Sequence, residues 1–300
     1  MNILNYLLYY FIILPIAYLP FRVLYFLSDV LFLVFFHLAG YRKKVVLRNI
    51  ANSFPELSKE EHNRIASKFY RHFCDVMVET FKSFAITKEE LLKRNKLTNP
   101  ELINQYFEKG QSVILAGGHY NNWEWVATGM DHQVKHQVIA IYKALSNKFF
   151  DEKVLKSRSN FGLQMISTKR VAEVFDNNKN DLTATIFAID QSPSNPRKAY
   201  WMQFLNQETA CFYGTEKYAR QYNMPVLFGS VKKVSRGHYE YSFSVVTENP
   251  ASEEKGFITK KTNLILENDI LQAPEFWLWT HKRWKHQRPE GIQMETVFEL

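Results

Sequence analysis

The sequence predicts an α/β protein whose mixed, mostly parallel sheet is flanked by helices and follows an N-terminal hydrophobic, membrane-anchoring helical segment. Three observations predict this fold. Residues 3–39 are almost entirely apolar, short apolar segments alternate with helical ones from residue 112 onward, and residues 224–246 resemble a closing hairpin. Such alternation is typical of a parallel sheet covered by helices. We therefore divide the chain into an anchor, residues 1–40, and one globular domain, residues 41–300.

The N-terminal apolar run contains only two ionised side chains, Arg22 and Asp29. A helix needs about 20 apolar residues to span a bilayer. This run is longer and prolines interrupt it, so it fits a kinked span followed by an interfacial helix, two short re-entrant segments, or a helical anchor in one leaflet. A buried helix pair of a soluble protein is the remaining alternative, and a cleaved signal peptide fits poorly because no basic residue precedes the run. The basic cluster at 41–48 predicts that the domain stays on the cytoplasmic side.

Local signals predict the individual elements of the domain. Ser58 and Thr87 are each followed three residues later by glutamate, the capping-box pattern, which predicts helices at 59–84 and 88–95. Strands are expected at 112–116, 137–142, 182–189, 224–231 and 239–246. The remaining helices are expected at 122–130, 148–159, 169–178, 214–222 and 259–284, with a surface loop at 192–197.

Composition narrows the range of partners. The formal net charge of +8 and the pI near 9.2 favour anionic partners, such as a phospholipid, a phosphorylated glycolipid or an acidic carrier protein. No RNP, helix-turn-helix or zinc-finger pattern occurs, so nucleic acid is not an expected partner. The two cysteines, Cys74 and Cys211, have no CxxC spacing, which argues against a disulfide framework or a metal site. Aromatic residues make up 15% of the chain, and Tyr and Trp favour membrane interfaces.

The stretch GGHYNNWEW, residues 117–125, follows a predicted buried strand and opens a predicted helix. Its glycine pair breaks the strand pattern, as a strand-to-helix turn does, and Asn121 or Asn122 is suited to cap the helix. This places His119 at the carboxyl-terminal tip of a strand and Glu124 in the first turns of the helix. Ligands of α/β sheets bind at that edge, so the stretch predicts a functional site.

His119 and Glu124 are the leading candidates for chemistry. The pKa of imidazole lies near neutrality, so His119 can take a proton from a hydroxyl. A carboxylate on its other ring nitrogen would fix the tautomer and stabilise the imidazolium, and Glu124 is the predicted partner. The alternative is a strand-end histidine that only hydrogen-bonds to its helix. No GxSxG, Walker A, GxGxxG or HExxH motif occurs and Cys211 is expected to be structural, so we predict a direct, single-step group transfer.

These residues carry a family resemblance. GHYNNWEW resembles the H-x4-D/E motif in the form found in the late acyltransferases of lipid A biosynthesis, within the glycerolipid acyltransferase superfamily. The similarity extends to the hydrophobic N-terminus and to IYKALSN (141–147), LKSRSNFG (155–162), IFAIDQ (186–191) and APEFWLWTHKRWKHQRPEG (273–291). Asn121 replaces the family's usual glycine, and SPSNPRKAYWMQFLNQ replaces its glycine-rich stretch. The second departure concerns the preferred acceptor or acyl chain rather than the reaction.

The resemblance implies a membrane-bound enzyme that moves a fatty acyl group from an acyl carrier protein thioester to a hydroxyl of a lipid A precursor. It also implies that the enzyme works at the cytoplasmic face of the inner membrane and needs no cofactor or metal. His119 would be the general base and Glu124 its orienting partner. Substrate binding is assigned to Asn122, Arg158, Asp190 and Gln191.

The basic C-terminal segment FWLWTHKRWKHQR adds further candidates. Trp277 and Trp284, seven residues apart on one face of the predicted helix, are expected either in the core or at the bilayer interface. Three cations are expected to bind an anionic lipid head group or an acidic carrier protein: Lys282, Arg283 and Lys285. Two other functions stay open: an acyltransferase for a lysophospholipid or an amino-acid lipid, and a membrane-anchored lipid-binding protein without turnover.

Overall fold

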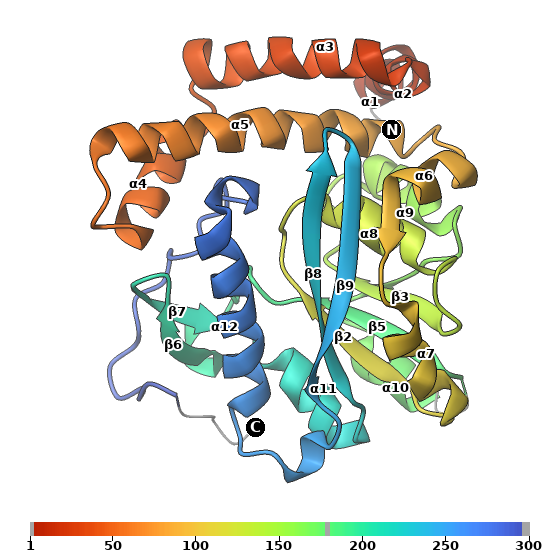
Figure 1. Ribbon diagram of the computed structural model, residues 1–300, viewed down its shortest axis with the longest axis vertical. Helices are drawn as coiled ribbons and strands as arrows, with labels where there is room; N and C mark the ends of the chain where they lie inside the picture. Colours follow the sequence, from red (N-terminus) through yellow and green to blue (C-terminus); the bar gives the residue numbers. More distant parts are fainter. Residues whose placement is uncertain (1–2, 178–180, 296–300) are drawn as a thin grey trace.

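The computed structural model describes residues 3–177 and 181–295 and confirms the α/β architecture (Figure 1). Seven strands form one sheet in the order β1-β9-β8-β2-β5-β3-β4, and every neighbouring pair is parallel except β8–β9. In chain order the strands are β1 (Asn95–Leu97), β2 (Val113–Gly117), β3 (Gln137–Tyr142), β4 (Gln164–Ser167), β5 (Thr183–Ala188), β8 (Val226–Ser235) and β9 (His238–Thr247).

The five predicted strands are confirmed as β2, β3, β5 and the β8–β9 hairpin. The sequence analysis missed β1 and β4, because runs of three and four residues show no periodicity that separates them from a loop. It also missed a two-stranded sheet made of β6 (Tyr200–Phe204) and β7 (Gln207–Cys211). The two residues between these strands, Leu205 and Asn206, both have positive φ, which is the geometry of a tight hairpin turn.

Most predicted helices are also confirmed. α5 (Lys59–Lys82) and α6 (Lys88–Arg94) begin at their predicted caps, where the side chains of Ser58 and Thr87 accept hydrogen bonds from backbone N–H groups of the first turn. The helices between strands are α8 (Trp123–Met130), α9 (Lys148–Ser159), α10 (Val171–Asn177) and α11 (Gly214–Tyr222). Residue 178, the last of a predicted helix, lies outside the described residues. Two helices were not predicted: α4 (Lys43–Ser53) and α7 (Pro100–Glu108).

The last predicted helix, 259–284, is wrong in its second half. α12 (Phe257–Gln272) ends early, and a 3-10 turn, η5 (Pro274–Phe276), follows it. Proline has no N–H to continue a helix, and the residue before it avoids helical geometry, as Ala273 does here with φ −147° and ψ 78°. The chain beyond η5 therefore runs irregularly against the loop that carries His119 and forms an isolated bridge with it.

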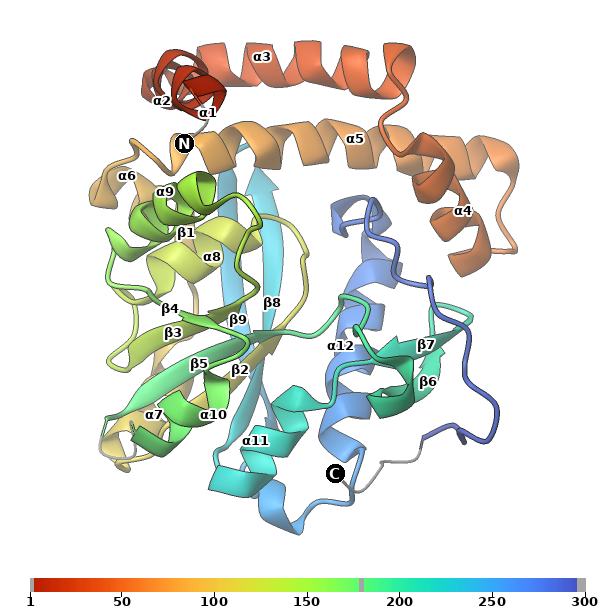
Figure 2. The same cartoon turned by 180° about the vertical axis from the view of Figure 1, so that it is seen from behind.

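The sheet is covered on both faces, and β2 lies at its centre (Figures 1 and 2). Ile114 and Ala116 belong to the core shared with α11 and α12, whereas Val113 and Leu115 belong to the core shared with α7 and α8. Alternate side chains of a strand point to opposite faces, so β2 is buried on both. The carboxyl end of β2 is thus held rigidly between two helical layers.

The N-terminal residues form α1 (Ile3–Leu8), α2 (Leu14–Tyr18), α3 (Phe21–Phe32) and two π-helical turns, η1 (Tyr9–Ile13) and η2 (Leu33–Leu38). α3 lies along α5 at one end of the molecule in both views (Figures 1 and 2). By length and composition, Phe21–Leu38 is apolar enough to cross a bilayer. This segment is the candidate membrane anchor.

Candidate active site

His119 lies at the tip of β2, as predicted. The strand ends at Gly117, and a side chain at Gly118 would place its Cβ 2.7 Å from Leu266 of α12, so glycine fits where the chain passes this helix. Asn121 has a φ of +53°, a left-handed geometry that asparagine tolerates better than most residues. The turn therefore survives the replacement of the family's usual glycine.

Asp190, just beyond β5, is the carboxylate that contacts His119. Its Oδ1 lies 2.7 Å from Nδ1 of His119, and its Oδ2 accepts a hydrogen bond of 2.8 Å from the backbone N–H of the same residue. The indole Nε1 of Trp277 donates to Oδ2 over 2.8 Å. The parallel register sets Gly117 opposite Ala188, so the residues two positions beyond each strand are neighbours.

The predicted contact between Glu124 and His119 is wrong, because Glu124 pairs with Arg158 of α9. Nη2 of Arg158 donates to both carboxylate oxygens over 2.7 Å, and Nε donates to Oε2 over 3.0 Å. Trp123 contacts both groups: its ring packs edge-on against that of His119, and its Nε1 donates to Glu124 over 3.2 Å. Nδ1 of His119 already faces Asp190, so Glu124 lies beside the imidazole without binding it.

The hydrogen-bond partners define the tautomer of neutral His119. An ionised carboxylate only accepts hydrogen bonds, so the ring proton is assigned to Nδ1, facing Asp190. Nε2 then carries a lone pair and accepts from the side-chain amide of Gln191, 3.2 Å away. The His119 side chain is 18% exposed. Nε2 is therefore the ring atom that a ligand reaches by displacing the Gln191 amide.

The two charges of the pair stabilise each other. Burial lowers the pKa of His119, but the charge and hydrogen bond of Asp190 outweigh it and the net shift is upward. Burial raises the pKa of Asp190, and the contacts with His119 and Trp277 outweigh that effect and bring it to about 2. Asp190 is therefore ionised at neutral pH, and His119 is a base whose imidazolium has a fixed counter-charge.

Asn122, which the sequence analysis assigned to substrate binding, is completely buried and serves the fold. Its Oδ1 accepts a hydrogen bond from the backbone N–H of Trp125 and so caps α8, which confirms the prediction that Asn121 or Asn122 caps this helix. Its Nδ2 donates to Oε2 of Glu79 over 2.7 Å. Glu79 also accepts from the hydroxyls of Tyr239 and Tyr25, each over 2.8 Å. With both polar atoms of its side chain occupied, Asn122 is not available to a substrate.

The C-terminal tryptophans belong to the core. Trp277 and Trp279 are 2% and 0% exposed, and Trp277 reaches Asp190, so the core alternative is confirmed for Trp277. Trp284 is half-buried, with its ring 5.9 Å from that of Trp277 and its Nε1 donating to Thr209.

The cations of this segment separate into a buried one and two exposed ones. Arg283 is 1% exposed, and its guanidinium donates to the backbone carbonyls of Ala210 and Gln191. The prediction that it meets lipid or carrier protein is therefore wrong: the non-helical chain after η5 directs it into the interior, where it holds the backbone of Gln191. Lys282 and Lys285 are exposed, as an anion-binding role requires.

Similarity to known proteins covers nearly the whole chain. Residues 1–286 match the family described as bacterial lipid A biosynthesis acyltransferase. The chain belongs to this family. It is accordingly an acyltransferase, as the resemblance of its motifs implied.

Relatives of this acyltransferase share about a fifth of its residues. The lipid A biosynthesis lauroyltransferase of Escherichia coli strain K12 is 22% identical over 279 residues, covering 92% of this chain and 90% of the relative. The lipid A biosynthesis palmitoleoyltransferase of the same strain is 22% identical over 251 residues, covering 83% and 80%. A lipid A biosynthesis acyltransferase of Haemophilus influenzae is 20% identical over 252 residues, covering 83% and 79%.

Three side chains at the site of this acyltransferase were not predicted. They are Trp277, which binds Asp190; Glu79, which binds Asn122; and His281, whose Nε2 accepts from the backbone N–H of Ser192 over 3.0 Å. Burial lowers the pKa of His281 to about 4, so it is neutral. Each lies at least 43 residues from its partner, and no local pattern marks such contacts.

Within residues 3–177 and 181–295, no group of three or more His, Cys, Asp or Glu side chains is placed to hold a metal ion.

Glu79→Gln is expected to change how the stability of the acyltransferase depends on pH. Burial, and to a smaller extent Asp75, raise the pKa of Glu79 from its ordinary 4.5 to about 7. The folded chain then keeps a proton that the unfolded chain loses, so this contribution to stability is complete below 4.5 and is lost as the pH rises through 7. Between about pH 5 and about pH 8, urea unfolding should show the wild type losing on the order of 2 kcal/mol more than the variant.

Glu56→Gln is the matched control, because Glu56 lies on an exposed turn before α5, outside the buried network. Its stability should follow the wild-type pH curve. The same pH dependence in wild type and Glu79→Gln would mean that Glu79 is ionised in the folded chain, with its charge held by the three side chains that donate to it.

Proposed function

We propose that this chain transfers a fatty acyl group from acyl carrier protein to a hydroxyl of a lipid A precursor at the cytoplasmic face of the inner membrane. The observation that carries the proposal is the Asp190–His119 pair, which holds Nδ1 of the imidazole and leaves Nε2 as the candidate base at the carboxyl edge of the sheet. The printed names of the relatives, all lipid A biosynthesis enzymes, support the acceptor. We assign residues 1–40 to membrane binding and residues 41–300 to the acyltransferase domain.

In this mechanism His119 is the general base. The acceptor hydroxyl takes the place of the Gln191 amide at Nε2 and gives its proton to that nitrogen while its oxygen attacks the thioester carbonyl carbon. A C–O bond forms, and the tetrahedral intermediate then expels the carrier's sulfur as the C–S bond breaks. The imidazolium returns the proton to the leaving thiolate. Asp190 holds the tautomer and stabilises the imidazolium between the two proton transfers.

The environment of the two thiols supports transfer without an acyl-enzyme. Cys211 is completely buried, and burial raises its pKa. Cys74 is also completely buried, and burial raises its pKa to about 12. A protonated, shielded thiol is a poor nucleophile. The acceptor hydroxyl itself is therefore the nucleophile in the proposed reaction.

The Glu124–Arg158 pair has a separate role in the proposal. Glu124 binds Nε and Nη2 of Arg158 and so fixes the plane of the guanidinium, while Nη1 stays outside this pairing. The Arg158 side chain is 25% exposed, and its charge acts on His119. We infer that Nη1 binds the thioester oxygen, where negative charge develops as the hydroxyl attacks.

Glu124→Gln is expected to lower kcat by about 10²-fold with a smaller change in KM. Glutamine accepts on one atom only, so it loses the charge-assisted bidentate contact that aims Arg158. Steady-state kinetics with acyl carrier protein as donor measure the effect. Glu173→Gln is the matched control, because it breaks an exposed Arg–Glu pair on α10 and should leave kcat unchanged. A wild-type kcat for Glu124→Gln would remove the pair from the mechanism.

The segment that departs from the family pattern directly follows Gln191, whose side-chain amide contacts Nε2 of His119. A cavity of about 330 Å³ is lined by Pro193 and Tyr200 from this segment and by Tyr213 at the start of α11. Pro193 follows Gln191 by two residues, and Gln191 contacts His119. We propose that this segment determines the preferred acyl chain or acceptor. Lys282 and Lys285 are the proposed contacts for the acidic carrier or a lipid head group.

A transfer assay with the purified protein tests the proposal. Fatty acyl carrier protein and a lipid A precursor should give, by mass spectrometry, a lipid heavier by one acyl group and an equal amount of free carrier thiol. Acyl coenzyme A is the donor control, and a lysophospholipid and an amino-acid lipid are acceptor controls. Product from either of these lipids but not from the lipid A precursor would assign the alternative acceptor. Thiol release without any lipid product would overturn the transfer.

A further inference from the structure

We propose that residues 3–38 lie in the plane of one membrane leaflet, with the outward face of α3 in the hydrocarbon and α5 outside it, instead of crossing the bilayer. The proposal rests on the membrane location proposed above and is independent of the transfer chemistry. Three features support it: the lengthwise packing of α3 on α5, the apolar face that α3 leaves uncovered, and the cations along the edge of that face.

α3 and α5 pack side by side in opposite directions through contacts that recur along both helices. The hydroxyl of Tyr25 donates to Oε1 of Glu79 over 2.8 Å. One turn further along α3, the hydroxyl of Ser28 donates to Oδ1 of Asp75 over 2.7 Å. One more turn along, Arg71 lies 4.1 Å from the centroid of an α3 aromatic ring. The position of α3 is therefore set by polar groups of α5 over its length.

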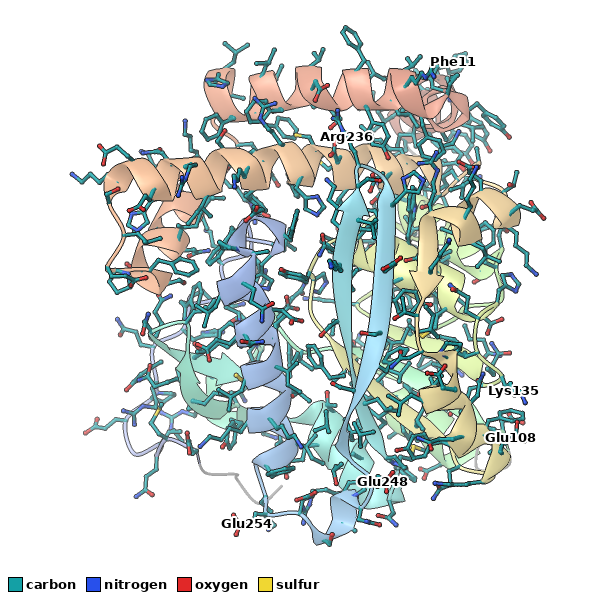
Figure 3. The ribbon with its side chains drawn as sticks, viewed as in Figure 1. Phe11, Glu108, Lys135, Arg236, Glu248 and Glu254 are labelled. Atoms are coloured by element: carbon teal, nitrogen blue, oxygen red, sulfur yellow. The ribbon has the colours of Figure 1, made fainter. Side chains whose placement is uncertain are left out.

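A spanning α3 would carry these polar groups into the membrane. The side chains of Glu79 and Asp75 face α3, and α5 has lysines at both ends. The tip of the β8–β9 hairpin joins the same contact, because Arg236 bonds Asp29 over 2.8 Å and Asp75 over 2.7 Å (Figure 3). Polar and ionisable side chains at bilayer depth are strongly unfavourable. α3 keeps these contacts only if its axis lies parallel to the membrane surface.

The opposite side of α3 is apolar and uncovered. Val23, Phe26 and Val30 of α3 and Leu33 at the start of η2 follow each other at helical spacing and are 41%, 66%, 42% and 54% exposed. This spacing places them on one stripe. Phe11, 74% exposed, lies at the outer edge of the preceding helices (Figure 3). The stripe has the arrangement of an amphipathic helix that lies in a membrane interface.

Charge at the edge of this face identifies its partner as an anionic phospholipid surface. Two cations of the globular domain, Lys43 and Lys153, lie over aromatic rings of the N-terminal helices, with 3.9 and 4.9 Å to the ring centroids. Cations beside aromatic rings favour the depth of the phospholipid head groups, where the cation meets phosphate and the ring meets acyl chains. An apolar stripe edged by cations therefore fits lipid better than a second protein chain.

Spin labels test the orientation in vesicles of phosphatidylcholine and phosphatidylglycerol. Labels at Val23→Cys and Leu33→Cys lie roughly 15 Å apart along the helix axis. We expect both labels at the same depth, and a label at Glu60→Cys, at the start of α5, in water. The native cysteines are completely buried and contribute little background. The proposal would be overturned if the labels at residues 23 and 33 differed in membrane depth by nearly their full separation along the helix axis.

Side-specific labelling in cells provides a second measurement. Arg22→Cys and Lys44→Cys place exposed thiols on either side of residues 23–38, the second half of the apolar run. A membrane-impermeant maleimide should find both on the same side of the membrane. A spanning helix would put them on opposite sides, and that result would contradict the in-plane arrangement.

Vesicle sedimentation tests the apolar stripe itself. Phe26→Glu should weaken binding to these vesicles by at least about tenfold, because it removes a large apolar side chain from the immersed face. Leu271→Glu is the matched control, since it replaces an exposed leucine on α12 and should bind like the wild type. Equal binding by both variants would contradict the proposal. Phe26→Glu should keep its transfer rate in detergent, so loss of binding is distinguished from failure of the proposed function.

Discussion

Acyl transfer should nearly vanish in His119→Ala, with a loss of about 10²–10⁴-fold in kcat. Alanine provides no base for the proton of the acceptor hydroxyl, and it also leaves Asp190 without the imidazolium that the carboxylate stabilises. The initial rate of lipid product formation from acyl carrier protein measures the loss. Binding to membranes should persist, because His119 lies outside the α3–α5 contact.

His132→Ala is the control for this prediction, because His132 is an exposed histidine on the turn after α8. Its rate should equal that of the wild type. Near-wild-type turnover by folded His119→Ala would show that the proton is accepted elsewhere, and the Asp190–His119 assignment would then be wrong.

Asp190→Asn should cost about 10³–10⁴-fold in kcat, more than Glu124→Gln. Two N–H donors, from the His119 backbone and Trp277, point at Oδ2 of Asp190. The asparagine oxygen must accept both, which turns its NH₂ group toward Nδ1 of His119. That nitrogen then has to accept, so the ring proton moves to Nε2 and the base is blocked.

The pH dependence of the remaining activity distinguishes this mechanism from general damage to the fold. Asp190 raises the pKa of His119, so removing its charge should lower that pKa and move the acid limb of the kcat/KM profile to lower pH. The plateau should fall at the same time. Asp176→Asn, an exposed carboxylate on α10, should change neither feature. A reduced plateau with an unmoved acid limb would mean that Asp190 acts only on the fold.

Local signals in the sequence predicted most of the elements correctly. Apolar β-branched runs marked β2, β3 and β5, and the capping residues Ser58 and Thr87 marked the starts of α5 and α6. The position of His119 followed from the same reasoning, because a strand, a glycine pair and a capped helix are all defined by near neighbours. Periodicity, turn chemistry and capping depend on residues a few positions apart, so one sequence is enough to show them.

The choice of carboxylate for His119 depended on tertiary structure. Glu124, five residues from His119, is the partner that the local sequence predicts, whereas Asp190 is 71 residues away. The deciding fact is that β2 and β5 are neighbours in the sheet although other strands separate them in the chain. Strand order is fixed by how the helices cover both faces of the sheet, and one sequence contains no local signal for it.

For the C-terminal segment and the anchor as well, the sequence determined the composition and the tertiary structure determined the contacts. The sequence by itself determined that residues 3–39 are apolar and that residues 276–288 combine tryptophans with cations. Only the tertiary structure decided that Arg283 is buried while Lys282 and Lys285 are exposed, and that one face of α3 binds α5. The chemical type of a side chain determines how much free energy its burial gains or costs. The packing of the folded chain determines which residues surround it once it is buried.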